Sequence, residues 1–158
     1  MKKNVTAVKK AIENNRSTGL FTRIMVFGTF DILHPGHLHF FKQARALAKN
    51  PYLIVSIARD INVKRIKGKL PLHNERQRAA LVRYSGLADK VVFGDREGYI
   101  RHIIKHEPAI ILLGYDQRAY TENLKGLLPS NILIKRARPY RPDLHKTSII
   151  KKFYDYTA

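Results

Sequence analysis

Short apolar runs recur along the chain and alternate with segments that have helical spacing. The runs that predict strands are Arg23–Phe27, Tyr52–Ala58, Lys90–Phe93, Ala109–Leu113 and Ile132–Lys135. The second and fourth are nearly continuous in apolar residues, which is typical of strands that are buried on both faces of a sheet. The pattern therefore indicates a core of parallel strands.

Helical spacing falls between these runs. The segments that predict helices are Gly36–Ala48, Glu75–Tyr84, Tyr99–His106, Thr121–Leu128 and Ser148–Tyr156. Strands that alternate with helices form right-handed βαβ units. We therefore expect an α/β fold, a Rossmann-like five-stranded parallel sheet with helices on both faces. Such a sheet binds ligands beyond the carboxyl ends of its strands, at the point where the strand order reverses.

Two segments depart from the alternation. Residues 1–20 hold a short basic helical pattern that ends at Ser17-Thr18-Gly19, and we expect an N-terminal appendage ahead of a single domain over residues 21–158. Residues 59–74 form a long basic connection, RDINVKRIKGKLPLHN, in which the pattern predicts no clear structure. Connections of this length are usually functional or mobile, so we expect a lid that orders when nucleotide binds.

Composition narrows the classes of protein that fit. The 158 residues include no cysteine, which excludes disulfides, zinc sites built on cysteine and thiol nucleophiles. No apolar run approaches the ~20 residues of a membrane span, so we expect a cytoplasmic protein. Thirty Lys and Arg residues against twelve Asp and Glu residues give a net charge of +18. A positive field of this kind attracts nucleoside triphosphates, phosphorylated substrates or nucleic acid.

The stretch GTFDILHPGH directly follows the first predicted strand. Gly28 allows close approach of a ligand to the backbone, and Pro35-Gly36 begins a helix whose free N–H groups favour phosphate oxygens. His34 and His37 are three residues apart and can reach the same point. The alternatives are a buried histidine pair that caps a helix, and a metal site that includes His39.

The sequence His34-Pro35-Gly36-His37 resembles the HxGH signature of the nucleotidylyltransferase superfamily, and the longer stretch resembles its cytidylyltransferase-type branch. The resemblance covers roughly residues 23–152. It implies that Thr29 and Phe30 line a nucleotide pocket together with Gly28 and Gly36. It also implies that His34 and His37 are catalytic residues that hold the triphosphate and stabilise charge on the α-phosphate. Asp31 would organise the motif or lie near the acceptor, unless it only caps the helix.

Two basic motifs add to the resemblance. In KRIKGKLP, Lys67 and Lys69 match lysines that close over the phosphates in the family, and Lys64 is a further candidate. In ERQR, Arg78 matches a phosphate-facing arginine better than Arg76 does. A solvated basic loop and a surface arginine are the structural alternatives.

Two later motifs also match the family. LLGYDQ ends the fourth predicted strand, where Gly114 would permit close approach and Asp116 would accept from a ribose hydroxyl or the acceptor, unless the motif is a simple turn. In KTSIIKK, Thr147 and Ser148 would hold the triphosphate at the start of the last helix, or only cap it. Arg136 and Arg138 are phosphate candidates, whereas His102 and His106 are interpreted as surface or packing residues.

The resemblance implies transfer of a nucleotidyl group from ATP or CTP to a phosphorylated acceptor, with Mg²⁺ carried by the triphosphate and with no metal site made by protein ligands alone. IARD, KGKLP and LGYDQ are most similar to archaeal-type FAD synthases, which adenylylate FMN. Glycerol-3-phosphate cytidylyltransferases are the next most similar group. The chain departs from the archaeal pattern in its lack of C-terminal cysteines, its N-terminal helix and its charge. A non-catalytic relative that binds nucleic acid, weak nucleic-acid binding by the enzyme, and a homodimer stay open.

Overall fold

A five-stranded parallel sheet forms the centre of the protein. The computed structural model describes residues 21–118, 121–141, 143–144 and 150–151. The strands are β1 (Thr22–Gly28), β2 (Pro51–Ile57), β3 (Lys90–Phe93), β4 (Ile110–Leu113) and β5 (Leu133–Arg136). The sequence pattern predicted every one of these strands to within one residue at each end, and the predicted α/β class is confirmed.

The strand order β3-β2-β1-β4-β5 places β1 at the centre of the sheet. Gly28 at the end of β1 pairs with Ile57 of β2, and Met25 pairs with Ile111 of β4 on the other side. The order runs outward from β1 in both directions, so the crossovers reverse between β1 and β4. The carboxyl ends of these two strands therefore flank the point where a ligand is expected.

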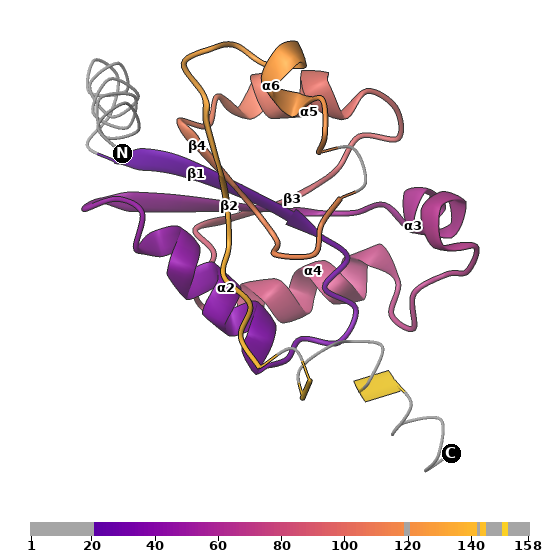
Figure 1. Cartoon of the computed structure of the whole chain (residues 1–158). Helices are drawn as coiled ribbons and strands as arrows, with labels where there is room; N and C mark the ends of the chain where they lie inside the picture. The colour runs from indigo at the N-terminus through magenta and orange to yellow at the C-terminus, as the bar shows by residue number, and fades with distance from the viewer. Residues whose placement is uncertain (1–20, 119–120, 142, 145–149, 152–158) are drawn as a thin grey trace.

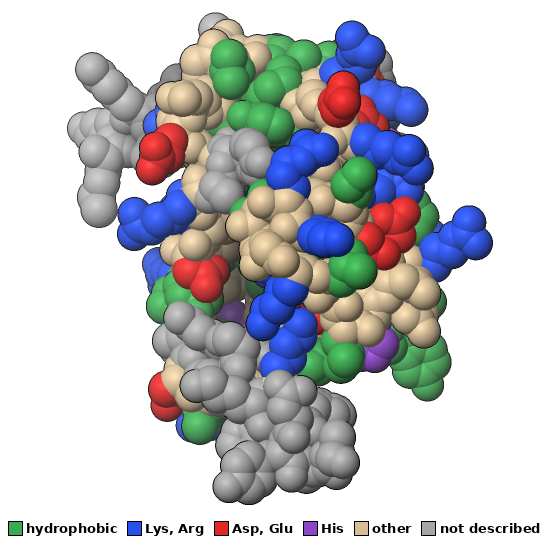
Figure 2. All heavy atoms as spheres, turned by 90° about the vertical axis from the view of Figure 1, so that its right-hand side faces the viewer, with side chains coloured by type: hydrophobic (Ala, Val, Ile, Leu, Met, Phe, Trp, Pro, Cys, Tyr) green, Lys and Arg blue, Asp and Glu red, His purple; other side chains and the backbone are tan. Residues whose placement is uncertain are grey.

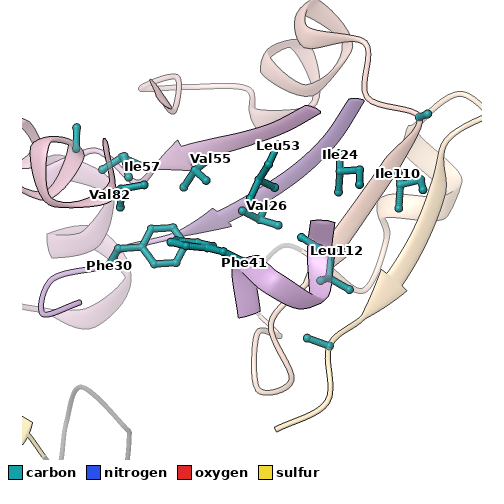
Figure 3. Packing of buried hydrophobic residues seen from close by; sticks show 14 residues of the cluster. Ile24, Val26, Phe30, Phe41, Leu53, Val55, Ile57, Val82, Ile110 and Leu112 are labelled. Atoms are coloured by element: carbon teal, nitrogen blue, oxygen red, sulfur yellow. The ribbon is translucent and has the colours of Figure 1, made fainter. Parts of the chain in front are cut away.

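Helices cover both faces of the sheet (Figure 1). The helices α2 (Pro35–Arg45) and α4 (Glu75–Tyr84) lie on one face, and α5 (Tyr99–His106) and the short α6 (Leu124–Leu127) lie on the other. Alternate residues of each strand divide between two buried clusters. In β1, Ile24 and Val26 pack toward α2, whereas Met25 packs toward α5. Figure 3 shows the first cluster, in which Phe41 of α2 lies against the sheet.

The basic connection after β2 contains a helix, α3 (Asp60–Lys67), where the sequence pattern predicted no clear structure. The first residues of α3 and α4 hold each other, because Glu75 accepts from the Asp60 amide at 2.9 Å and Asp60 accepts from the Glu75 amide at 3.1 Å. Gly68, with a positive φ of 75°, ends α3. Only Val63 of this helix is buried, which explains why hydrophobic spacing did not reveal it.

Other helix boundaries differ modestly from the predictions. The helix α2 ends at Arg45 and not at Ala48, and α6 begins at Leu124 and not at Thr121. The predicted N-terminal helix over residues 1–20 lies outside the described residues, as does most of the predicted helix at Ser148–Tyr156. Across the part of the chain that the structure describes, no helix has the length and apolar character needed to cross a bilayer.

Candidate active site at the carboxyl ends of the strands

A cavity of about 780 Å³ opens at the carboxyl ends of the strands. Most of the residues predicted for the site line it. They are Gly28, Thr29, Phe30, Asp31, His34, Gly36, His37, Lys67, Lys69, Gly114, Asp116 and Arg138. Lys and Arg side chains gather on the face of the molecule that carries α3, at this end of the sheet (Figure 2). Segments far apart in the sequence therefore meet in one basic site.

The two motif histidines stack at the start of α2. His34 is the N-cap residue, and its Nδ1 atom accepts a hydrogen bond from the Gly36 amide at 3.1 Å. Pro35 occupies the first turn, where its missing N–H costs nothing. The ring of His37 lies over that of His34, with 3.8 Å between centroids. His34 thus caps the helix, and both histidines line the cavity.

The His37 ring is uncharged at neutral pH. Burial is the main cause, and the neighbouring His34 adds to it, so that the pKa of His37 falls to about 3. The ring packs edge-on against Phe30, with centroids 5.2 Å apart. Within the described residues, His37 Nδ1 is buried and has no hydrogen-bond partner. A neutral imidazole can still donate one hydrogen bond to a phosphate oxygen, although it contributes no full positive charge.

Gly28 makes room for Phe30. Phe30 has a positive φ of 51°, which turns its ring back beneath the end of β1, where it also packs against Phe41. A Cβ atom on Gly28 would lie 2.5 Å from the Phe30 ring. The glycine is therefore required by internal packing, beside any close approach of a ligand, and Phe30 is chiefly a core residue at the cavity wall.

Asp31 ties the motif to two other segments. Its carboxylate accepts from the amides of Leu72 at 2.8 Å and His73 at 2.9 Å, and it forms an ion pair with Lys151. Burial alone would raise the pKa of Asp31, but Lys151 and the two amides together lower it below its usual value. The carboxylate is only 2% exposed and its contacts are internal, so its geometry favours a positioning role.

Lys67, at the end of α3, reaches back to the motif. Its Nζ atom lies 3.4 Å from Thr29 Oγ1. Burial and the nearby Lys151 lower the pKa of Lys67, while Asp31 and Asp116 oppose this change. Lys69 also lines the cavity, whereas Lys64, on the same helix as Lys67, does not. The structure thus brings together the two lysines that the sequence favoured.

Arg78 lies behind the cavity wall. Its side chain is fully buried, and it donates to the carbonyl oxygens of Thr29 at 2.6 Å, Ala58 at 2.7 Å and His73 at 3.0 Å. It also forms an ion pair with Asp60 at 2.7 Å. These contacts join the loops that follow β1 and β2 to the starts of α3 and α4. The geometry favours positioning of the site over the predicted contact with phosphates.

A side chain of β5 supports the turn that follows β4. Arg136 donates to the carbonyl oxygens of Gly114 at 2.8 Å and Gln117 at 2.7 Å, so its guanidinium supports the turn that presents Asp116. A Cβ atom on Gly114 would make only ordinary contacts, the nearest 3.5 Å away. The backbone of Arg138 is fixed by reciprocal hydrogen bonds with the Gln43 side chain, at 2.9 and 3.0 Å.

Two further histidines, His39 and His102, lie apart from the stacked pair. His39 stacks on Tyr140, with ring centroids 4.4 Å apart, and does not join the His34–His37 pair. His102 is 4% exposed and lines the cavity, where its Nε2 atom lies 2.9 Å from Ser56 Oγ. Sequence reasoning interpreted His102 as a surface or packing residue and did not consider Ser56, because neither belongs to a motif.

The predictions for Thr147 and Ser148 cannot be compared with geometry, because both residues lie outside the described residues.

The described residues hold no evident metal site. Over residues 21–118 and the shorter described segments after them, no group of three or more His, Asp or Glu side chains is arranged to hold a metal ion.

The chain is similar to known proteins over most of its length. The cytidylyltransferase-like family model matches residues 25–155. An FAD synthase of Methanosarcina barkeri is 44% identical over 117 residues, which are 71% of this chain and 81% of that protein. An FAD synthase of Thermoplasma volcanium is 34% identical, over 82% of this chain and 92% of that protein.

A solved structure has the same fold. It is described as a lipopolysaccharide core biosynthesis protein from Thermoplasma volcanium GSS1, and it superposes with a TM-score of 0.68 at 34% identity over 75% of this chain and 98% of that chain. These findings confirm the resemblance drawn from GTFDILHPGH. The chain belongs to the cytidylyltransferase-like family of nucleotidyltransferases.

Proposed function

We propose that this protein is an FMN adenylyltransferase, an FAD synthase that uses ATP. A phosphate oxygen of FMN would form a bond to the α-phosphorus of ATP, and the bond from that phosphorus to the bridging oxygen would break to release pyrophosphate. The observation that carries the proposal is the stacked His34–His37 pair at a helix start, open to a cavity with Lys67 and Lys69. The identity with archaeal FAD synthases supports the choice of ATP and FMN.

The residues divide between contact and positioning. His34, His37, Lys67 and Lys69 would contact phosphate oxygens and stabilise the charge that develops on them. Because a phosphate is already a nucleophile, no side chain has to act as a strong base, and catalysis consists mainly of orientation and electrostatics. Thr147 and Ser148 stay predicted triphosphate ligands. Asp116, presented by the turn after β4, would accept from a ribose hydroxyl or the acceptor.

Mg²⁺ fits this site as a companion of the triphosphate. Asp31 is occupied by internal hydrogen bonds, and Asp116 is a carboxylate that lines the cavity after β4. The donor set therefore suits an ion held mainly by phosphate oxygens. When bound, the ion neutralises charge on the phosphates of the nucleotide. We also propose that the enzyme is cytoplasmic. Assembly as a homodimer and weak binding of nucleic acid through the positive charge remain predictions from the sequence.

Product analysis tests the proposal. Purified protein is incubated with Mg²⁺ and either ATP plus FMN or CTP plus glycerol 3-phosphate, and the products are separated by chromatography. We expect FAD and pyrophosphate from the first pair and little reaction from the second. CDP-glycerol formation without FAD would overturn the flavin assignment and retain nucleotidyl transfer. Release of pyrophosphate from neither pair, together with salt-sensitive retention of nucleic acid, would favour the non-catalytic alternative.

A further inference from the structure

Helix α2 holds the chain that follows β5 at two points. Gln43 Nε2 donates to the Arg138 carbonyl oxygen at 2.9 Å, and the Arg138 amide donates to Gln43 Oε1 at 3.0 Å. Four residues earlier on the helix, the His39 ring stacks on the Tyr140 ring with 21° between their planes. Residues four apart lie on one face of a helix, so the same face of α2 makes both contacts. The post-β5 segment, residues 137–141, is therefore fixed against α2.

The post-β5 segment is also held at its start and stiffened in its middle. Ala137 is buried, and its amide donates to the Leu113 carbonyl oxygen at 2.8 Å. Pro139 restricts its own φ angle and favours an extended conformation of the residue before it, which is Arg138. The backbone from which the Arg138 side chain extends is therefore well defined.

The Arg138 guanidinium has no acceptor among the described residues. Both hydrogen bonds that Arg138 makes in this part of the chain use its backbone atoms. Arg138 lines the cavity, whereas Gln43 does not. The guanidinium is thus a cation at the cavity whose donors are left for a ligand.

Arg136, two residues earlier, provides a contrast. Its guanidinium donates to the carbonyl oxygens of Gly114 and Gln117, so the turn after β4 takes up part of its hydrogen-bonding capacity. Arg136 also does not line the cavity. The sequence named both arginines as phosphate candidates, and the geometry favours only Arg138.

An arginine without an internal acceptor suits a particular class of ligand. The planar guanidinium binds carboxylate or phosphate groups through paired, parallel hydrogen bonds. Both substrates of the proposed reaction, ATP and FMN, carry phosphate, and neither carries a carboxylate. The stacked histidines, Lys67 and Lys69 line the same cavity, so other groups that bind phosphate adjoin it. A substrate phosphate is therefore the ligand that Arg138 fits.

Gln43 affects such a contact without touching the ligand. Binding immobilises a long arginine side chain, which costs conformational entropy. The cost is smaller when the backbone that carries the side chain is already fixed. Because Gln43 holds both the amide and the carbonyl group of Arg138, it limits the positions that the guanidinium samples.

We propose that Arg138 contacts a phosphate group of a bound substrate and that Gln43 is the residue that positions it. This inference rests on the proposed FMN adenylyltransferase function for the identity of the substrates. Helix α2 then serves the site twice. Its start carries the stacked histidines, and the face with His39 and Gln43 holds the post-β5 segment.

Binding measurements test both parts of the proposal. The affinities of FMN, riboflavin and a non-hydrolysable ATP analogue with Mg²⁺ are measured for the full chain and for Arg138→Met, Gln43→Leu and the double variant. Arg141→Met is the matched control, because it removes the same charge from the post-β5 segment at an exposed residue that does not line the cavity.

The expected losses fall on ligands that carry phosphate. Arg138→Met should weaken binding of FMN or of the ATP analogue about tenfold, and Gln43→Leu should weaken the same ligand about threefold. Riboflavin, which has no phosphate, should bind all variants alike. The double variant should bind no more weakly than Arg138→Met, because Gln43 acts through Arg138.

Each outcome decides one part of the proposal. A loss for FMN alone assigns the contact to the acceptor phosphate, and a loss for the ATP analogue alone assigns it to the nucleotide. Wild-type affinities for Arg138→Met, an equal loss in Arg141→Met, or an equal loss for riboflavin and FMN would overturn the phosphate contact. Additive losses in the double variant would overturn the positioning role of Gln43.

Formation of FAD by wild type is measured in parallel. If wild type forms FAD while Arg138→Met binds every ligand normally, the phosphate contact fails and the proposed function stands. If wild type forms no FAD, the proposed function fails, and the affinities for the ATP analogue still decide whether Arg138 contacts phosphate. Circular dichroism and melting temperature confirm that each variant folds.

Discussion

The guanidinium of Arg78 donates to the carbonyl oxygen of Thr29 at 2.6 Å, although no part of the Arg78 side chain is exposed. Lys67 also contacts Thr29, through the Oγ1 atom of its side chain. The buried arginine therefore fixes the backbone of the motif residue that Lys67 also contacts.

Replacement of Arg78 should chiefly destabilise the fold. Arg78→Met leaves three carbonyl oxygens and the Asp60 carboxylate without their donor, and we expect a loss of about 3 kcal/mol or more in the free energy of unfolding. Arg76→Met, on the exposed side of the same helix, is the control and should change stability little. Urea denaturation measures the free energy of unfolding of both variants. If the Arg78 variant had wild-type stability and only weaker ATP binding, the predicted phosphate contact would be correct.

The neutral state of His37 predicts how stability depends on pH. The pKa of His37 is about 3 in the folded protein and 6.5 without the fold. Below pH 6.5 the unfolded chain binds a proton that the folded protein does not, so this contribution to stability is complete above pH 6.5 and is lost as the pH falls toward 3. Well inside that window the loss is about 1.4 kcal/mol per pH unit.

Urea denaturation at pH 7.5, 6.0 and 5.0 tests this dependence. His37→Asn should reduce the pH dependence of the free energy of unfolding by the contribution of His37. His39→Asn, which alters a ring stacked on Tyr140, serves as the control. Equal slopes for wild type and His37→Asn would show that the imidazole titrates normally in the folded protein.

Much of the fold follows from the sequence, because each strand is a short apolar run and each buried helix face repeats at helical spacing. The helix α3 could not be predicted in this way, since only Val63 of its eight residues is buried and its ends are held by Glu75 and Gly68. The motif residues were found because they adjoin strand ends. Ser56 and His102 were missed because a polar residue inside a strand and one on a helix meet only through tertiary packing.

Arg78 illustrates a different limit of what the sequence can predict. The sequence placed it correctly at the start of α4 but could not distinguish an arginine that contacts phosphate from one that binds carbonyl oxygens, since both need the same side chain. The distinction depends on Thr29 and Ala58, which are 49 and 20 positions away in the chain. Only the packing of the strand ends determines it.

Asp31 should stabilise the loop that joins α3 to α4. Asp31→Asn removes one acceptor for the amides of Leu72 and His73 and breaks the ion pair with Lys151, so we expect a loss of about 1–3 kcal/mol. Because the pKa of Asp31 is lowered in the folded protein, its contribution is present above pH 3.8 and is lost as the pH falls through the folded value. Thermal unfolding at pH 7 measures the loss, with the exposed Asp143→Asn as control. Equal melting temperatures for Asp31→Asn and Asp143→Asn would contradict the positioning role.

The end of α3 should be protected when the cavity is filled. Its N-terminal end is held by Glu75 and Arg78, whereas Lys67, Gly68 and Lys69 at the other end are exposed. Trypsin should therefore cut after these lysines in the free protein and more slowly with saturating ATP, Mg²⁺ and FMN. Mass spectrometry identifies the cleavage sites. Equal cleavage rates at Lys67 and Lys69 with and without ligands would argue against closure of this segment over the phosphates.

Lys67 and Lys64 form a matched pair for a test of charge in the site. Both belong to α3 and both are exposed, but only Lys67 lines the cavity and reaches Thr29 Oγ1. Although much of the Lys67 side chain is exposed, its partial burial is the main cause of its lowered pKa, and this partial removal from water strengthens its electrostatic action on a bound phosphate. Lys67→Met should lower kcat/KM by about 10²-fold, the order found when one preorganised donor to a developing charge is removed. Lys64→Met should retain nearly full turnover while changing the net charge by the same amount. If the two variants lost activity equally, the lysines would act only through the general positive field, and the effect would then diminish with added salt for both.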